Sequence, residues 1–136
     1  MIVVDTNIIA YLYLPNEHSL AVETLLRKNP HWVAPSLWRS ELRNVLALYL
    51  RKKILTFEQA YDIQTEAEAL LTDREYNVSS YDVLSIAHTS HCSAYDCEFI
   101  SLAQKLNTSL VTSDKKVLQT FPTIAISLQT ALMQFP

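Results

Sequence analysis

The chain has 136 residues, of which 49% are hydrophobic and 18% are charged, and its formal net charge is −3. This composition is typical of a globular protein, and the length predicts one domain over residues 1–136. The net charge argues against broad electrostatic binding of nucleic acid, although acids gathered in one site can dominate such a count. The chain has no glycine, which excludes the Walker phosphate loop and the dinucleotide-binding fingerprint, because both need glycine next to phosphate.

The sequence predicts a cytoplasmic protein that does not enter a membrane. No stretch approaches the roughly 18 uncharged apolar residues of a membrane-spanning helix. The first apolar run has no basic segment before it and is interrupted by Asp5, so no signal peptide is expected. Cys92 and Cys97 are the two cysteines, and without export signals they are expected to be reduced thiols.

Short apolar runs alternate with helical patterns along the chain. The predicted strands cover residues 2–4, 31–35, 76–78, 109–113 and 123–127. The predicted helices cover residues 7–14, 19–29, 37–53, a segment after Thr56, 81–91, 94–107, 114–121 and the C-terminal residues. Ser36 and Ser93 are expected N-caps, and Asn107 stands where a left-handed residue is expected after a helix. This alternation predicts an α/β fold with a parallel sheet and helices on both faces.

Two acids directly follow predicted strands. Asp5 comes after the strand at 2–4, and Asp114 comes after the strand at 109–113. In a parallel sheet, ligands bind at the carboxyl ends of the strands. We therefore expect both carboxylates to project from the same edge.

Two further acids fall on apolar faces of predicted helices. At about 100° per residue, Glu41 lies within the apolar arc of its helix, whereas Arg39 lies on the other side. Asp96 lies near the edge of an apolar arc that includes Tyr95, and Glu98 is expected on the opposite, solvated side. A carboxylate that faces a core costs several kcal/mol unless it is paired or neutralised.

Each of these acids also has an ordinary structural interpretation. Asp96 could complete a capping box with Ser93, and Asp114 could cap its own helix. Asp5 could be a turn residue, and Glu41 could pair with a buried arginine. If the four converge instead, they repel one another, and Mg²⁺ or Mn²⁺ would relieve that repulsion while bridging to substrate phosphate.

The segments "VVDTN", "SEL", "SAYDCEFISLA" and "LVTSD" resemble, in this order, the motifs of PIN-domain ribonucleases, specifically VapC-type toxins of toxin–antitoxin pairs. The resemblance spans nearly the whole chain. It implies an α/β/α sandwich with a central parallel sheet, endoribonuclease activity that depends on Mg²⁺ or Mn²⁺, a homodimer and a cognate antitoxin. It carries the family's site residues to Asp5, Glu41, Asp96 and Asp114, with polar partners at Thr6, Asn7 and Thr112.

Roles within the implied site follow from how the elements hold each residue. Asp5 and Asp96 are expected to be direct metal ligands, and Glu41 and Asp114 to act through metal-bound waters. Some relatives carry a further acid just after the last aspartate, whereas Lys115 and Lys116 follow here. We therefore expect one firmly bound ion, and these lysines are candidates for RNA contact, although a solvated helix start also accounts for them.

Two other functions compete with the ribonuclease. A phosphatase could use Asp5 as a nucleophile, but that chemistry expects an acid two residues later, where Asn7 stands. A catalytically silent binding module would keep the fold and is expected to lose a site acid. A zinc site from His88, His91 and the two cysteines is also conceivable, but Cys97 belongs to a different predicted helix from the others.

Overall fold

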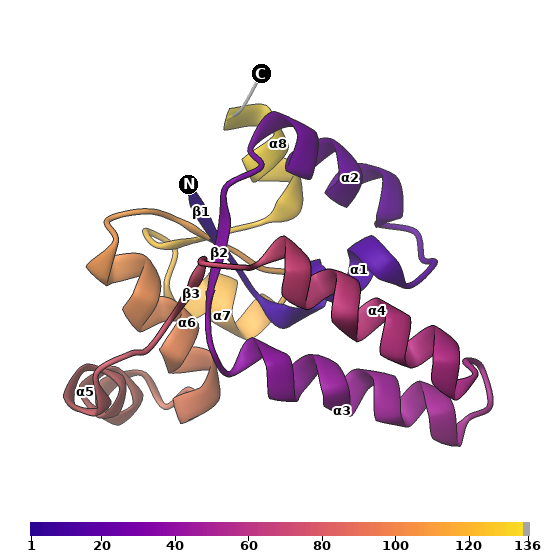
Figure 1. Cartoon of the computed structure of the whole chain (residues 1–136). Helices are drawn as coiled ribbons and strands as arrows, with labels where there is room; N and C mark the ends of the chain where they lie inside the picture. The colour runs from indigo at the N-terminus through magenta and orange to yellow at the C-terminus, as the bar shows by residue number, and fades with distance from the viewer. Residues whose placement is uncertain (135–136) are drawn as a thin grey trace.

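The computed structural model describes residues 1–134, and five short strands form one sheet at its centre (Figure 1). The strands are β1 (Ile2–Val4), β2 (Trp32–Pro35), β3 (Glu75–Tyr76), β4 (Leu110–Val111) and β5 (Ala125–Ile126). Their order across the sheet is β3-β2-β1-β4-β5, and every neighbouring pair is parallel. The predicted α/β fold with a central parallel sheet is confirmed.

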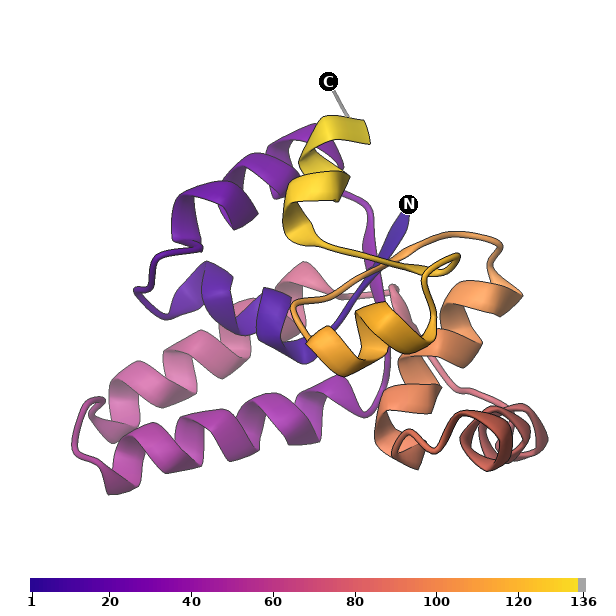
Figure 2. The ribbon, with the colours of Figure 1, turned by 180° about the vertical axis from the view of Figure 1, so that it is seen from behind.

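Helices lie on both sides of this sheet (Figures 1 and 2). They are α1 (Thr6–Tyr13), α2 (Ser19–Lys28), α3 (Trp38–Arg51), α4 (Phe57–Leu70), α5 (Ser80–Ser90), α6 (Ala94–Lys105), α7 (Lys115–Thr120) and α8 (Leu128–Gln134). Helix α6 packs on β1, β2 and β4 with α5 beside it, while α3 and α4 pair on the other side and α2 lies beside α8. Within residues 1–134, no helix is long and apolar enough to span a membrane.

The core is built around the two central strands. Every residue of β1 and β2 is buried, as expected for parallel strands covered on both faces. Helix α1 adds Ile8 and Ile9 to this core, and α6 adds Ile100 and Leu102. Burial of such side chains contributes about 1.5–3 kcal/mol each, so the sheet and the helices that follow its strands form one well-packed scaffold.

The predicted helix caps are confirmed with one exception. Ser93 caps α6 by accepting a hydrogen bond from the Asp96 amide, 3.1 Å away. Asn107 has a φ of 52°, and the Thr108 amide donates to the Ala103 carbonyl, which is the Schellman arrangement. The prediction that Ser36 caps α3 is wrong, because Leu37 occupies the N-cap position. The Ser36 hydroxyl donates a hydrogen bond to the Tyr76 backbone carbonyl instead.

The face of α6 differs in part from the helical-wheel prediction. Tyr95, expected in the apolar arc, is 62% exposed, and Cys97 is fully buried against Val83 and Cys92. Glu98, expected on the solvated side, is only partly exposed. The reason is that α5 packs against α6, so α6 has a second buried face that a single apolar stripe does not predict. Both cysteines are free thiols.

An ion-pair network joins β3 to α3. The Arg39 guanidinium donates to both oxygens of Glu75 at 2.6 Å, and Trp38 Nε1 donates to Glu75 at 2.7 Å. Arg39 also reaches Glu68 at 2.9 Å. These contacts hold the pKa of Glu75 below its usual range. They fix the N-terminal turn of α3, the helix that carries Glu41.

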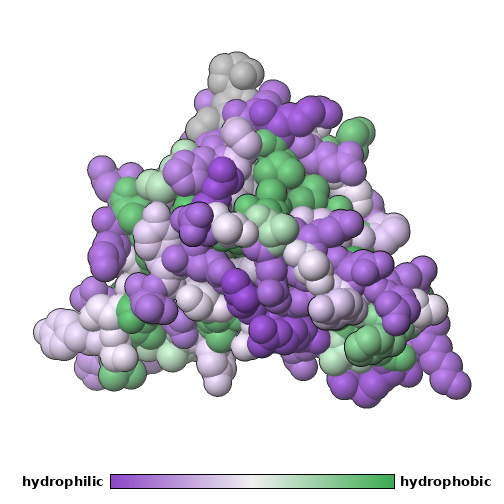
Figure 3. Space-filling view, in the orientation of Figure 1, coloured by the Kyte–Doolittle hydropathy of each residue, from purple (hydrophilic) through white to green (hydrophobic). Residues whose placement is uncertain are grey.

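Hydrophobic side chains are exposed where α3 turns into α4. Ile54 and Phe57 are 60% and 68% exposed, and the Phe57 ring stacks on Tyr61 with ring centroids 6.2 Å apart. In Figure 3, hydrophobic surface lies over this end of the helix pair, at the lower right. The rest of the face in that view mixes polar and apolar groups.

Candidate active site

Asp5 and Asp114 lie at the carboxyl ends of neighbouring strands. Asp5 follows β1 and caps α1, accepting from the Ile8 amide at 3.0 Å. Asp114 follows β4 and caps α7, accepting from the Val117 amide at 3.1 Å. Because β2 and β3 extend the sheet to one side of β1 and β4 and β5 to the other, this is the switch point where such sheets bind ligands.

Thr112 joins the two strand-end acids. Its hydroxyl donates to Asp5 Oδ2 and accepts from the Asp114 amide at 3.0 Å. The Thr112 side chain is buried, so this bridge is protected from water. It orients Asp5 and fixes the start of the Asp114 turn relative to β1.

Glu41 reaches the same region from α3. Its carboxylate accepts a hydrogen bond from the Thr6 hydroxyl at 2.6 Å, and Thr6 is itself buried next to Asp5. None of the ion pairs formed within residues 1–134 involves Glu41. The alternative that Glu41 pairs with a buried arginine is therefore wrong, because Arg39 turns to Glu75 on the other side of the helix.

Asp96 enters from the first turn of α6. The cap at Ser93 uses the Asp96 backbone amide, so the carboxylate is not needed for it. Asp96 is partly buried and lines the same hollow as the other three acids. Asp5 and Asp114 therefore do cap their helices, and their side chains also line the cavity that contains Glu41 and Asp96.

The four carboxylates line one open cavity of about 500 Å³. They come from four elements that are distant in sequence, since Asp5 and Asp114 are separated by more than 100 residues. Polar groups from α1 and α3 complete the wall beside an apolar floor. The lining residues are Asp5, Thr6, Asn7, Leu37, Ser40, Glu41, Asn44, Val45, Tyr95, Asp96, Phe99, Leu110, Thr112, Asp114 and Val117.

Burial and mutual repulsion raise the pKa values of three of these acids, Asp5, Glu41 and Asp96. Burial raises the pKa of Asp5 to about 6, and the charges of Glu41 and Asp114 add to the rise, while the Thr112 hydrogen bond opposes it. Burial also raises the pKa of Glu41, with a further contribution from Asp96. The pKa of Asp96 is raised by burial and then by the charge of Asp114. The charge of at least one neighbouring carboxylate therefore contributes to the raised pKa of each of these three acids.

The comparison with known families decides what kind of domain carries this cavity. The PIN domain family matches residues 2–121. The chain belongs to the PIN domain family. The family predicted from the sequence motifs is thereby confirmed, and the match contains all four cavity acids.

Individual relatives agree with this assignment. Ribonuclease VapC3 from Pyrobaculum aerophilum is 27% identical over 128 residues, which cover 90% of this chain and 96% of that protein. The crystal structure of PAE2754 from the same organism has a TM-score of 0.79 at 18% identity, covering 98% of this chain and 88% of that one. The crystal structure of FitAcB from Neisseria gonorrhoeae has a TM-score of 0.71 at 17% identity, covering 95% of this chain and 99% of that one. At these identities, the two structures establish the PIN fold.

The donor set of this PIN domain suits a hard divalent cation. Four carboxylates with amide and hydroxyl oxygens are the ligands that Mg²⁺ and Mn²⁺ prefer. A cation would offset both the burial and the repulsion that raise the pKa values of Asp5, Glu41 and Asp96. Among the described residues, no three His, Cys, Asp or Glu side chains are arranged to hold a metal together. An ion here would therefore keep several waters, as Mg²⁺ commonly does.

The smaller predicted site residues fall into three groups. Thr6 and Thr112 are buried and hold Glu41 and Asp5, as described above. Asn7 lines the cavity but is exposed. Lys115 and Lys116 are exposed at the start of α7, where the Lys116 ammonium donates to the His91 carbonyl at 3.1 Å and lowers the pKa of Asp96.

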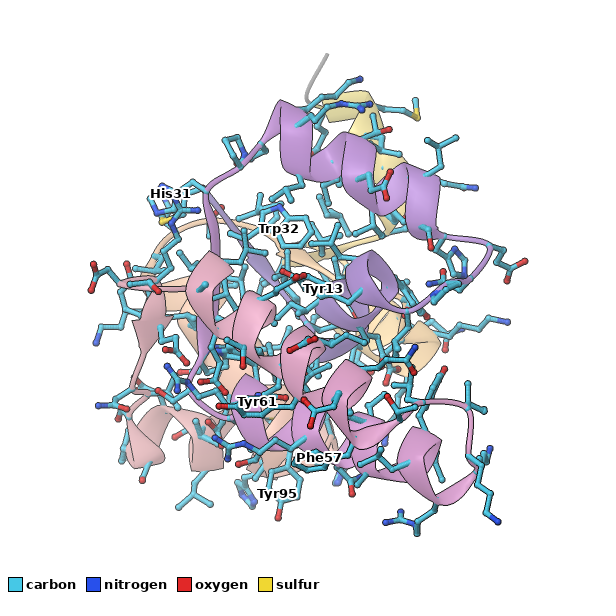
Figure 4. All side chains as sticks on the ribbon, turned by 45° about the vertical axis from the view of Figure 1, so that its right-hand side comes forward. Tyr13, His31, Trp32, Phe57, Tyr61 and Tyr95 are labelled. Atoms are coloured by element: carbon cyan, nitrogen blue, oxygen red, sulfur yellow. The ribbon has the colours of Figure 1, made fainter. Side chains whose placement is uncertain are left out.

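Three cavity residues with polar side-chain groups were absent from the site predicted from the sequence. Ser40 and Asn44 line the cavity on either side of Glu41 along α3, and the spacing of a helical turn could have found Asn44, three residues after Glu41. Tyr95 lines the cavity beside Asp96, and Figure 4 shows its ring projecting outward at the lower edge of the molecule. An exposed aromatic at the mouth of such a site is a platform on which a nucleobase can stack.

Proposed function

We propose that this chain is a metal-dependent endoribonuclease that cleaves RNA phosphodiester bonds with a metal-activated water. The observation that carries the proposal is one cavity that gathers Asp5, Glu41, Asp96 and Asp114. Burial and then the charges of neighbouring carboxylates raise the pKa values of the first three of these acids. Stored repulsion of this kind is tolerated where a bound cation offsets it. The similarity to a protein named Ribonuclease VapC3 supports RNA as the substrate.

The residues of the cavity divide into ligands and positioning groups. A bound Mg²⁺ or Mn²⁺ would polarise the phosphate and acidify a coordinated water. Asp5 and Asp96 are the proposed direct ligands, because a strand end and a capped helix turn hold them rigidly. Glu41 and Asp114 accept hydrogen bonds from waters in the cavity and orient the attacking one.

Thr6 and Thr112 keep this arrangement in register. Each hydroxyl donates to one carboxylate, Thr6 to Glu41 and Thr112 to Asp5, and partners of this kind orient metal ligands. Asn7 can hydrogen-bond to a coordinated water from the exposed rim. Lys115 and Lys116 directly follow the cavity residue Asp114 at the start of α7, which supports them as proposed phosphate contacts.

The proposed biological role is that of a cytoplasmic toxin held in check by an antitoxin. The resemblance of the sequence motifs to those of VapC-type toxins supports this role, together with the similarity to Ribonuclease VapC3. The exposed hydrophobic residues at the end of the α3–α4 pair are suited to protein contact, and we assign them to a homodimer or antitoxin interface. A small overlapping reading frame that encodes a DNA-binding partner would support the pairing.

The test is cleavage of total RNA by the purified chain in Mg²⁺ or Mn²⁺. The wild type and the Glu58→Gln variant, changed at an exposed residue of α4, are expected to cleave. Asp5→Asn and Asp96→Asn are expected to lose at least about a hundredfold in rate, because a carboxylate ligand is removed. Cleavage that ignores a chelator, or that survives Asp5→Asn, would refute the mechanism.

A further inference from the structure

A second cavity of about 520 Å³ is lined in part by segments that also contribute to the first. Two elements contribute to both. On the connection into α3, Ser36 lines the second cavity and Leu37 the first; on α6, Ala94 and Glu98 line the second and Asp96 the first. The lining residues of the second cavity are Ser36, Tyr76, Asn77, Val78, Ser80, Val83, Leu84, Ala94 and Glu98.

The wall of this cavity does not suit a phosphate. It contains no lysine, arginine or histidine, and Glu98 would repel an anion. The partly buried side chains of Tyr76 and Val78 and the buried Val83 provide aromatic and aliphatic surface. A flat, uncharged heterocycle fits such a wall better than a charged group does.

Two polar side chains in the wall are available to form hydrogen bonds with such a heterocycle. Glu98 is partly buried, and no hydrogen bond or ion pair formed among residues 1–134 engages its carboxylate. The Ser36 hydroxyl shares its proton between the Tyr76 backbone carbonyl and the Asn77 side-chain carbonyl, at 3.4 Å from each. The side-chain amide nitrogen of Asn77 is left to donate elsewhere. The cavity therefore offers an acceptor pair and a donor within an otherwise apolar wall.

We propose that this second cavity binds an unpaired nucleobase of the RNA, next to the phosphate that enters the first cavity. This inference rests on the proposed ribonuclease function and adds its sequence preference. Single-stranded RNA is commonly read by bases that leave the stack, pack on aromatic side chains and hydrogen-bond through their edges. Because the connection into α3 and the first turns of α6 contribute residues to both cavities, we expect one nucleotide to reach both.

The chemistry of the wall ranks the four bases. Guanine presents two adjacent N–H groups to the two oxygens of one carboxylate, and its carbonyl can accept from Asn77. Adenine and cytosine offer an amino group without an adjacent ring N–H. Uracil offers a single ring N–H flanked by two carbonyl oxygens, which a carboxylate repels. The expected order is therefore guanine first, adenine and cytosine next, and uracil last.

The experiment uses the full chain with Asp5→Asn to prevent cleavage, incubated in Mg²⁺ with a random pool of short single-stranded RNA. The retained RNA is sequenced. Guanine is expected to be enriched about tenfold over uracil at one position, as for one hydrogen-bonded pair with a charged group. Adding Glu98→Gln is expected to abolish that enrichment, whereas adding Glu58→Gln leaves it unchanged.

A second variant protects the test against a folding defect. Ser80 is exposed at the first turn of α5 and lines the cavity, so Ser80→Trp fills the space without disturbing the core. The Ser80→Trp variant is expected to lose the guanine preference. It should still bind the RNA pool and should melt at the wild-type temperature. Retention with no base preference, or a preference unchanged in both variants, overturns this inference alone. If the pool is not retained and the wild type cleaves no RNA, the proposed function fails with it.

Discussion

At the residue scale, the site depends on two threonines as much as on its acids. Thr112 donates to Asp5 and accepts from the Asp114 amide, and Thr6 donates to Glu41. Both threonines are buried, so water cannot replace these bonds without cost. Their hydroxyls determine which carboxylate oxygens remain free for a ligand.

Replacing Thr112 with valine tests this bridge. Thr112→Val keeps the shape but removes the hydroxyl, so metal affinity and cleavage rate are expected to fall about 10–100-fold, as for other groups that orient metal ligands. Thr112→Ser restores the hydroxyl and should recover most of the rate. Both are measured by RNA cleavage and Mn²⁺ titration; equal activity of the valine and serine variants would show that the bridge is irrelevant.

The raised pKa of Asp5 predicts how the free energy of unfolding depends on pH in the absence of metal. Its pKa rises to about 6 in the folded chain, from an ordinary value of 3.8. Between these values the folded state binds more protons than the unfolded state, so stability falls as pH rises through this range. Relative to Asp5→Asn, the wild type should lose about 2 kcal/mol of unfolding free energy between about pH 4 and about pH 7.

Urea unfolding in a chelator measures this difference. Comparing the two proteins at each pH cancels groups such as Glu75, whose lowered pKa gives stability that is lost toward acid. The account is contradicted if the free energy of unfolding of the wild type, relative to that of Asp5→Asn, stays constant with pH or increases as pH rises.

At the scale of single elements, much of the site could be predicted from sequence. Asp5 and Asp114 follow buried strands, and helical periodicity found Glu41 and Asp96. The same arithmetic misjudged Glu98, because α6 is covered by α5 on a face that the apolar stripe alone does not indicate. The second cavity depends on that packing between helices, so it was not predictable.

The end of α6 gives a test of element-level reasoning. Asn107 has a left-handed φ of 52° within the Schellman arrangement, a conformation that Asn and Gly tolerate and a Cβ-branched or Ala residue resists. Asn107→Ala is expected to lower the free energy of unfolding by about 1 kcal/mol, and Asn107→Gly to change it little. Chemical denaturation measures both, and equal effects of the two variants would contradict the local account.

At the scale of the whole molecule, strand order creates the site. Because β1 lies between β2 and β4, the chain brings Asp5 beside Asp114. Helix α3, which follows β2, adds Glu41, and helix α6, which precedes β4, adds Asp96. Sequence alternation predicted the parallel sheet, but not the order of its strands. That order makes four distant acids neighbours and gives the repulsion that a cation would offset.

The most direct test of this account is calorimetric titration of Mn²⁺ into the chain at about pH 8, well above the raised pKa of about 6 for Asp5. We expect saturable binding of about one ion per chain, weakened at least about tenfold by Asp5→Asn or Asp96→Asn because each removes a ligand charge. Glu58→Gln should bind like the wild type. Absence of saturable binding, or equal affinity in all four proteins, would contradict the claim that these carboxylates form one metal site.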